Sequence, residues 1–457
     1  FPEIMGEMLW PTWLQVTLKP DFSAEGLFES ARRLDVSRET SVPVSQQLAP
    51  SDAGRLAALL ADRRALVYAG EGTCTGELEA GKVLNWARAF RLPLLADPLS
   101  GLRSSDDPLV IDNYDSVLGP GGAAPDGLAP EVVVRFGRYP VSKKATQLVA
   151  AARPVQIVVD PLETRDCNAA TDVFVRCRPS ELAGSLGFAY DVRTIDYDPD
   201  DVQRAFARAW IDANDAARKR IASVDDAEAG FEGAFVRRVV ELAPEGSCLF
   251  SANSMSVRAL DTFYLKSAKR LAVLCNRGLN GIDGTVSTAL GAAQHFAQTT
   301  LVTGDLTLLH DLNALALQRE LRLQREAAAC FSASLDAASS KAAGAVTPGH
   351  ATDAASDNVA PGAVPSIVIV LLNNNGGGIF DMLPQKSEDP YFERLFLTPQ
   401  DVDFRAAAQA FGVPYRRADT VPAFDEAYRA LLGTPGISLV EVRVPLSGLK
   451  DRYAPYW

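Results

Sequence analysis

Two short segments combine residue types that could hold a phosphate group through a metal ion. The first is GDLTLLHDLNALAL at residues 304–317, and the second is LLNNNGGGIF at residues 371–380. A magnesium ion bound to a diphosphate prefers hard oxygen ligands, such as a carboxylate, a side-chain amide and a backbone carbonyl. Asp305, Asn374 and the carbonyl of Gly376 can supply that set. The two segments therefore predict a diphosphate site that depends on magnesium or manganese.

The surroundings of these residues support the same interpretation. The glycines would let the backbone approach the phosphates closely, and the helix predicted to start after Asp305 would direct its N-terminal dipole at their negative charge. Either segment alone is more simply interpreted as an ordinary turn. Each follows a predicted strand, however, and ligands of open α/β sheets bind beyond the carboxyl ends of strands. We therefore expect Asp305 and Asn374, 69 positions apart, to meet at one edge of a sheet.

Two blocks of alternating strands and helices would position these segments. Short β-branched runs that alternate with helical patterns are typical of parallel sheets with crossover helices. We expect an α/β fold with two Rossmann-like parallel-sheet domains, a central domain at residues 51–195 and a diphosphate-binding domain at residues 236–457, joined by a helical connector at residues 196–235. The expected strands are residues 65–69, 132–136, 155–159 and 173–175 in the first block, and 248–251, 271–275, 300–303, 367–372 and 438–442 in the second.

Two stretches do not fit this alternation. Residues 1–50 contain several prolines and few regular periods, which indicates an extended lead-in segment. Residues 327–366 are rich in Ala, Ser and Gly, and they offer too few large apolar side chains to build a core. We interpret them as an insertion in the second domain, whose latter half is predicted to be disordered.

Composition disfavours several functional classes. The 45 basic residues and 57 acidic residues give a net charge of −12, which would repel a nucleic acid. Apolar runs are shorter than the roughly 18 residues that a membrane span needs, so no membrane insertion is expected. The six cysteines form no zinc-binding pattern, which favours a soluble protein in a reducing compartment. His295 and His310 belong to no catalytic pattern and are interpreted as structural.

Further segments extend the motif. They are SANSMSVR at residues 251–258, CNRGLNGIDG at residues 275–284 and NNNGGGIFDMLP at residues 373–384. Together with residues 304–317, they resemble the thiamine-diphosphate enzymes, and among these the 2-succinyl-5-enolpyruvyl-6-hydroxy-3-cyclohexene-1-carboxylate (SEPHCHC) synthases of menaquinone and phylloquinone biosynthesis. The resemblance covers the second block and, more faintly, the first. In that family the interval between the two metal-binding motifs is shorter, and removal of the insertion would restore it.

The resemblance implies a transferase that uses thiamine diphosphate and magnesium. The ylide of the cofactor would attack 2-oxoglutarate, carbon dioxide would leave, and the resulting carbanion would add to isochorismate. Family members also have a pyrimidine-binding domain, whose Glu helps to generate the ylide. Residues 1–50 are too short to house it and would be its remnant. We therefore expect an incomplete fragment of a multifunctional polypeptide that is inactive alone. It would need a pyrimidine domain in trans or assemble as a homo-oligomer, and it would act in the cytoplasm or the chloroplast stroma.

The resemblance also assigns roles residue by residue. Besides the three metal ligands, the expected cofactor-binding positions are Gly281, Ile282, Gly304, Leu306, Ile379, Phe380 and Leu383. Ile282 would support the bent shape of the cofactor. Ile379, Phe380 and Leu383 would form an apolar wall around the substrate, although such residues are ordinarily core. Asn253 and Ser254 would face the reacting centre.

Two arginines are expected to bind substrate carboxylates, and two lysines match a pair that reaches the active site in the family. Arg258 and Arg277 suit two dicarboxylic substrates, because guanidinium groups bind carboxylates bidentately. Without the motif, Arg258 would be interpreted as a surface residue. Lys143 and Lys144 lie where the family has a Lys-Arg pair that reaches the active site, and a solvated charge pair is the alternative.

Other departures from the family pattern are Ala252, which replaces a glycine, and Leu279 with Asn280, which replace Ala-Ser. The larger Leu279 could crowd the cofactor pocket. Two alternatives to the synthase remain. Another thiamine-diphosphate 2-oxoacid decarboxylase or synthase would have little need of two guanidinium groups. A catalytically silent scaffold would be expected to lose Asp305 or Asn374.

Overall fold

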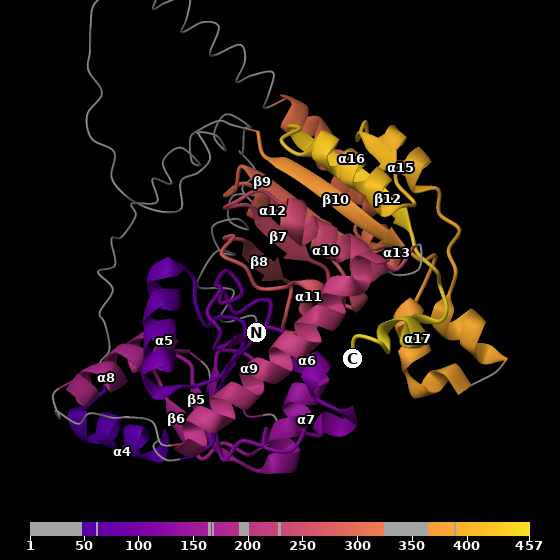
Figure 1. Cartoon of the computed structure of the whole chain (residues 1–457). Helices are drawn as coiled ribbons and strands as arrows, with labels where there is room; N and C mark the ends of the chain where they lie inside the picture. The colour runs from indigo at the N-terminus through magenta and orange to yellow at the C-terminus, as the bar shows by residue number, and fades with distance from the viewer. Residues whose placement is uncertain are drawn as a thin grey trace, which may run out of the picture. The chain divides into compact units, whose positions relative to one another are not determined.

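The computed structural model describes residues 48–60, 63–162, 166, 169–191, 201–226, 230–323, 364–387 and 390–457. Two six-stranded sheets form its framework, and every strand pair in them is parallel. The two sheets belong to one compact unit. The predicted α/β fold with two Rossmann-like parallel-sheet domains is confirmed (Figure 1).

The first sheet has the strand order β3-β2-β1-β4-β5-β6. Its central strands β1 and β4 are buried at every position, which explains their continuous apolar runs. The strands are β1 (Ala65–Ala69), β2 (Leu94–Ala96), β3 (Val110–Ile111), β4 (Val132–Phe136), β5 (Val155–Val159) and β6 (Val173–Val175). One face packs against α4 (Pro50–Leu60), α5 (Glu77–Phe90) and α8 (Pro179–Asp191), and the other against α6 (Tyr114–Val117), α7 (Lys143–Ala152) and α9 (Asp201–Ala222) (Figure 1).

The second sheet has the order β11-β12-β10-β9-β7-β8. Its strands are β7 (Cys248–Ser251), β8 (Ala272–Cys275), β9 (Gln298–Gly304), β10 (Ser366–Asn373), β11 (Tyr415–Arg417) and β12 (Gly436–Arg443). One face packs against α10 (Glu232–Leu242), α11 (Met255–Phe263), α16 (Val421–Leu431) and α17 (Leu449–Tyr453). The other packs against α12 (Thr285–Ala293), α13 (Asp305–His310) and α15 (Phe404–Ala410). Alternate residues of each strand thus feed two separate cores.

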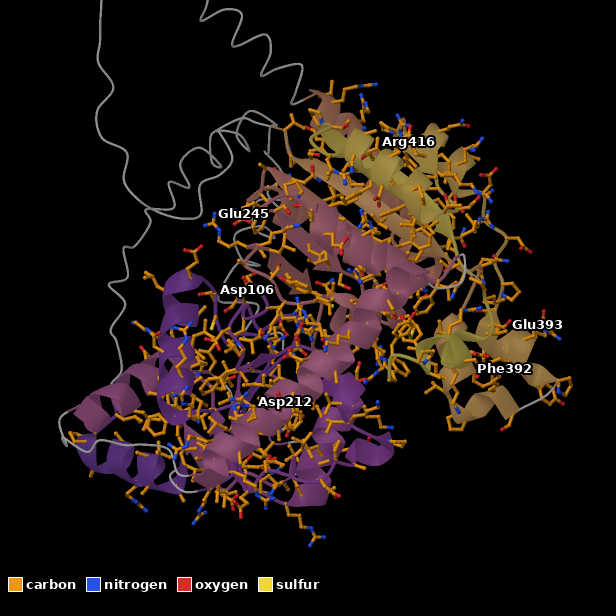
Figure 2. The ribbon with its side chains drawn as sticks, in the orientation of Figure 1. Asp106, Asp212, Glu245, Phe392, Glu393 and Arg416 are labelled. Carbon is orange, nitrogen blue, oxygen red and sulfur yellow. The ribbon has the colours of Figure 1, made fainter. Side chains whose placement is uncertain are left out.

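Short helical turns complete the described chain. They are η1 (Pro120–Gly122), η2 (Ser223–Asp226), η3 (Leu312–Ala316), η4 (Gly378–Met382), η5 (Pro384–Ser387) and the π-helical turn η6 (Glu393–Leu397). Charged side chains such as Asp212 on α9 and Glu393 on η6 lie at the surface (Figure 2). Within the described ranges, every helix is too short or too polar to cross a bilayer.

Each sheet contains a switch point, where successive strands are added on opposite sides of a starting strand. In the first sheet it lies between β1 and β4, and in the second between β7 and β9. The loops after two such strands turn away from each other and leave a crevice at the carboxyl edge, where ligands of this fold class bind. The predicted segments at residues 251–258 and 304–317 follow β7 and β9, so they border the crevice of the second sheet.

The expected strands of both blocks are present. Three of the nine have longer bounds than expected, and the one at residues 271–275 is shorter by one residue. The short strands β2, β3 and β11 were not predicted. The lead-in at residues 1–50 lies outside the described residues except for 48–50, and Pro50 already begins α4. The insertion at residues 327–366 likewise lies outside them except for 364–366, and Ser366 is the first residue of β10.

A buried ion pair joins the first block to helix α11 of the second. Arg103, 1% exposed, donates to the Asp261 carboxylate at 2.6 Å. The same guanidinium group donates to the carbonyls of Asp261, Tyr264 and Ala96. Because α11 carries Arg258 near its other end, this contact fixes the helix from which a predicted substrate ligand projects.

Candidate functional site

The two predicted metal-binding segments leave neighbouring strands at the same edge of the second sheet. Gly304, the last residue of β9, is paired with Leu372 in β10. Asp305 and Asn374 therefore emerge side by side, although 69 positions separate them. The backbone N–H group of Gly376 lies close enough to the Asp305 carboxylate to lower its pKa. The structure thus brings the two segments into direct contact.

Asp305 carries a carboxylate in a place that disfavours its charge. The residue is 4% exposed. Burial raises the pKa of its carboxyl group to about 6, against the opposing effect of hydrogen bonds from the N–H groups of Asp305, Leu306 and Gly376. Buried charges in proteins are normally paired or coordinate a metal. A divalent cation beside Asp305 would stabilise the ionised form.

The three consecutive asparagines have different partners. Asn373 donates to the Glu441 carboxylate at 2.8 Å, and Asn375 donates to Asp401 at 2.8 Å. Asn374 Oδ1 instead accepts the Gly376 N–H at 3.2 Å, the same N–H that contacts the Asp305 carboxylate. Asn374 is therefore the asparagine that lies at the junction of the two segments.

The glycines after Asn375 are required by the shape of the turn. Gly376 has φ +151°, and a Cβ atom there would lie 2.1 Å from the carbonyl oxygen of Leu397. A Cβ atom on Gly378 would lie 2.2 Å from Asn374 Nδ2. A side chain at either position would displace the backbone that presents Asn374 and the Gly376 carbonyl.

This arrangement fits a metal-bound diphosphate. It offers one carboxylate, one amide oxygen and one carbonyl, which is the chemistry that Mg²⁺ prefers. A Cβ atom on Gly304 would meet nothing within 4 Å, so space for a ligand adjoins the backbone there. The described part of the chain has no cluster of three or more His, Cys, Asp or Glu that could hold a metal. The predicted helix is α13, which begins at Asp305 itself and has six residues, so its dipole contributes little.

Asn253 organises the loop that carries Arg277. Its Nδ2 donates to the carbonyls of Asn276 and Gly281, at 2.6 and 2.8 Å. Its Oδ1 accepts from Arg277 Nη1 at 2.7 Å. Because the amide is 1% exposed and engaged at both ends, Asn253 supports the loop in this structure. Its predicted role at the reacting centre stays a prediction.

Ser254 follows with an unusual backbone conformation. Its φ of +64° lies in a region that non-glycine residues rarely adopt, and such residues concentrate at functional sites. Its carbonyl accepts a hydrogen bond from Arg258 Nη1 at 2.6 Å. Ala252, which stands where a glycine was expected, is buried and donates its N–H to Val302, so it fits the strand end without strain.

Arg258 and Arg277 form a pair of like charges. Burial and the charge of Arg277 lower the pKa of Arg258, so the two guanidinium groups lie within electrostatic reach of each other. Their hydrogen-bond acceptors are neutral oxygens, on Ser254 and Asn253. Arg258 is half-buried, and its role as a substrate ligand stays a prediction. Two adjacent, partly buried guanidinium groups are suited to bind a dianion.

The predicted apolar residues lie outside the core. Ile379, Phe380, Leu306 and Ile282 are half-buried, and Leu383 is 41% exposed. The Phe380 ring packs edge-on against Phe396, and the Phe396 ring also stacks on Phe392, which is labelled in Figure 2. Gly281 is exposed and its carbonyl contacts Asn253, whereas the Leu279 side chain is fully exposed.

The two lysines of α7 differ. Lys144 Nζ donates to the carbonyls of Asp115 and Leu118, at 2.9 and 3.0 Å, so it is bound within the first block. Lys143 is exposed at the first turn of the helix. The alternative of a solvated charge pair therefore fails for Lys144, and Lys143 stays a predicted site residue. His295 and His310 are both exposed, and His310 lies beside Asp283.

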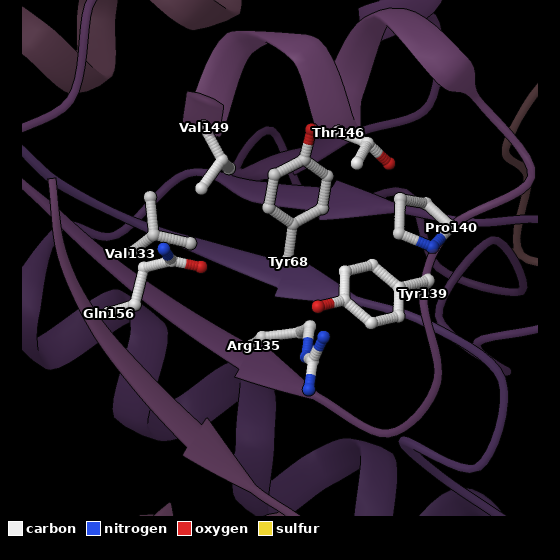
Figure 3. Close-up of a pocket in the computed structure, with 8 residues that line it drawn as sticks. All are labelled: Tyr68, Val133, Arg135, Tyr139, Pro140, Thr146, Val149 and Gln156. Atoms are coloured by element: carbon white, nitrogen blue, oxygen red, sulfur yellow. The ribbon is translucent and has the colours of Figure 1, made fainter. Parts of the chain in front are cut away.

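Sequence analysis missed two features of the first block. Arg138 donates from Nη1 to the carbonyl of Arg277, and the only local signal for it was its place after β4. A small pocket also lies between the sheet and α7, and no predicted site residue lines it (Figure 3). Its lining residues are Tyr68, Val133, Arg135, Tyr139, Pro140, Thr146, Val149 and Gln156.

Comparison with known proteins gives a consistent group of relatives. No family model matches the chain. The chain is 33% identical over 440 residues to the 2-succinyl-5-enolpyruvyl-6-hydroxy-3-cyclohexene-1-carboxylate synthase of Bacillus velezensis, which covers 94% of this chain and 66% of that protein. The synthase of the same name from Geobacillus thermodenitrificans is 36% identical over 388 residues, covering 84% of this chain and 57% of that protein. The chain thus spans 57–66% of the length of these relatives.

Proposed function

Because the chain belongs to the family of SEPHCHC synthases, we propose that it forms the cofactor- and metal-binding part of such a transferase. The reaction would join a succinyl group from 2-oxoglutarate to isochorismate with loss of carbon dioxide, in menaquinone or phylloquinone biosynthesis. When bound, thiamine diphosphate supplies the nucleophile and the electron sink for decarboxylation. The contact between Gly376 and Asp305 carries the proposal, because it joins the two halves of the predicted metal site.

In this proposal the protein positions the metal and the diphosphate. Asp305, Asn374 Oδ1 and the Gly376 carbonyl would coordinate magnesium. The backbone at Gly304 and Leu306 would lie against the phosphates, and Ile282 with Gly281 would contact the rest of the cofactor. The raised pKa of Asp305 supports this assignment, since a cation would offset the unfavourable burial of its charge.

Substrate binding would depend on the arginine pair. Arg258 and Arg277 would each take a carboxylate of a dicarboxylic substrate, which would also relieve their mutual repulsion. Lys143 would approach the same carboxylates from the first block. Ser254 would face the reacting atoms beside them. This pair favours the synthase over a decarboxylase of small monocarboxylic acids.

The segment after β10 would exclude water from the reacting centre. Ile379, Phe380 and Leu383 would cover the reacting carbon on its apolar side, and their partial exposure is what a wall completed by a ligand requires. We further propose that a pyrimidine-binding domain, in trans or from a second copy, supplies the Glu that initiates catalysis.

Calorimetry tests the cofactor assignment. Thiamine diphosphate with magnesium should give binding heat with the unmodified chain and none with Asp305→Ala, because the variant lacks the anionic ligand. Asp212→Ala, which removes an exposed carboxylate on α9, is the control and should retain the heat. Equal heats from all three proteins, or heat that persists without magnesium, would contradict the proposal.

A second experiment tests the reaction. A pyrimidine-binding domain added in trans should permit decarboxylation of 2-oxoglutarate but not of pyruvate. Arg277→Gln should reduce the 2-oxoglutarate rate at least about 10-fold, the loss of one charged hydrogen bond. A preference for pyruvate would favour another thiamine enzyme, and no turnover despite cofactor binding would favour the scaffold.

A further inference from the structure

The loop at residues 276–281 is held from two sides. Within the second block, Asn253 grips the carbonyls of Asn276 and Gly281. From the first block, Arg138 Nη1 donates to the carbonyl of Arg277 at 3.2 Å. A group at the switch point of one sheet thus reaches the loop that carries a predicted substrate ligand of the other.

The backbone around Arg138 is closely fitted. Its N–H donates to the carbonyl of Glu71 at 3.0 Å, which joins the loops after β1 and β4. A Cβ atom on Gly137 would lie 2.1 Å from Glu71 O, and one on Gly70 would lie 1.9 Å from Arg138 O. Only glycines permit these close backbone contacts, so the backbone that carries the Arg138 side chain is held in a defined position.

The side chain is held as well. Arg138 Nη1 donates to Glu71 Oε2 at 3.1 Å as well as to the Arg277 carbonyl. The two side chains of the pair are 37% and 30% exposed, so the pairing alone should contribute little to stability. The pair is better explained by its role in holding the Arg138 side chain against the carbonyl of Arg277.

Arg277 lies within electrostatic reach of charges of both signs, since its charge also lowers the pKa of the buried Asp97 carboxyl group, against the rise caused by burial. Its guanidinium group lies close enough to Arg258 to lower the pKa of that residue. Its position relative to both charges therefore depends on the loop that carries it. The hydrogen bond from Arg138 fixes the Arg277 carbonyl and so the backbone that carries the side chain. Asn253 Oδ1 accepts a hydrogen bond from the guanidinium group at the other end.

We propose that Arg138 is a positioning residue for Arg277, through which the central block sets the affinity of the site for a dicarboxylate. The proposal rests on the proposed function, in which Arg277 binds a substrate carboxylate. It predicts that the effect of Arg138 disappears when Arg277 is removed.

Hydrogen exchange tests whether Arg138 holds the loop. In Arg138→Gln, the amides of residues 276–281 should exchange about 3–10-fold faster, because the loop loses one of its two anchors. Arg138→Lys should restore slow exchange, since one ammonium group can reach both oxygens. Arg64→Gln is the matched control, because Arg64 is 36% exposed and pairs with Glu131 in the same block. Equal exchange in Arg138→Gln and Arg64→Gln would overturn the proposal.

Succinate binding by calorimetry then tests the coupling. Arg138→Gln should weaken binding about 3–10-fold in the unmodified chain and have no further effect in Arg277→Gln. Additive losses would refute a role through Arg277. If succinate binds equally with and without Arg277, the carboxylate part of the proposed function fails instead, and the exchange experiment alone still decides whether Arg138 anchors the loop.

Discussion

The carboxyl edges of the two sheets share a switch-point geometry but differ in how their charges are satisfied. At the edge of the first sheet, charged side chains contact one another or the backbone of the same chain, as in the pair Arg138–Glu71 and the contacts of Lys144. At the edge of the second, Asp305 and the arginine pair make hydrogen bonds to neutral groups. The first edge also has a buried carboxylate, Asp97, which accepts hydrogen bonds from backbone N–H groups. What distinguishes the second edge is that a carboxylate and a guanidinium pair occur there together, so that a ligand could match charges of both signs.

This difference teaches that the fold alone does not create a ligand site. Both sheets offer a crevice, and both use glycines to bring loops together. The second combines a buried carboxylate that would favour a cation with a guanidinium pair that would favour an anion. A metal-bound diphosphate together with a carboxylated substrate would satisfy both, and the first edge would then serve as its support.

The largest expected effect concerns the ion pair that joins the two blocks. Arg103→Leu should lower the free energy of unfolding by about 3–5 kcal/mol, because it leaves Asp261 buried without its partner. Urea unfolding would measure the change. Arg178→Leu, which removes a 59% exposed partner of Glu79, should change it by less than about 1 kcal/mol. Similar losses in the two variants would contradict a supporting role for Arg103.

Two glycine substitutions should distinguish the roles of the two sheet edges. Gly376→Ala and Gly137→Ala each place a Cβ atom 2.1 Å from a carbonyl oxygen at positive φ. Each should lower the free energy of unfolding by about 2–4 kcal/mol, from strain and overpacking. Only Gly376→Ala should also abolish magnesium-dependent binding of thiamine diphosphate in calorimetry at a temperature where both variants are folded. If Gly137→Ala abolishes it too, the proposed division between the edges is wrong.

The smallest expected effect distinguishes the two lysines of α7. Lys144→Met should lower the free energy of unfolding by about 1–2 kcal/mol, because two carbonyls lose a charged donor. Lys143→Met should change it by less than about 0.5 kcal/mol, since this side chain is exposed. Thermal unfolding would measure both. An equal response would mean that the contacts of Lys144 contribute nothing beyond a surface charge.

Local pattern predicted the central strands well and the short ones poorly. Val132–Phe136 is buried on both faces, so its apolar run marks the strand directly. Strand β3 (Val110–Ile111) has two residues, too few to show an alternating pattern, and only its pairing with β2 makes it a strand. Strand position also predicted that the segments at Asp305 and Asn374 would meet, because neighbouring parallel strands end at one edge.

Contacts between the blocks could not be predicted in this way. The pairing of Arg103 with Asp261 and the contact of Arg138 with the Arg277 carbonyl depend on how two separately patterned units pack. A lone arginine is more often a surface residue, so its type gave no signal. The positive φ of Ser254 is similarly invisible in a sequence, since serine itself favours no such conformation.

The pairing of Gly304 with Leu372 has a practical consequence. Because the two strands bring both predicted metal-binding segments to one place, the length of chain between them is free to vary without moving either. Loop-closure entropy changes by only about 0.6 kcal/mol for each doubling of such a connection. Between β9 and β10, a designer could therefore insert a fluorescent reporter or an affinity handle while the register of the two strands is preserved.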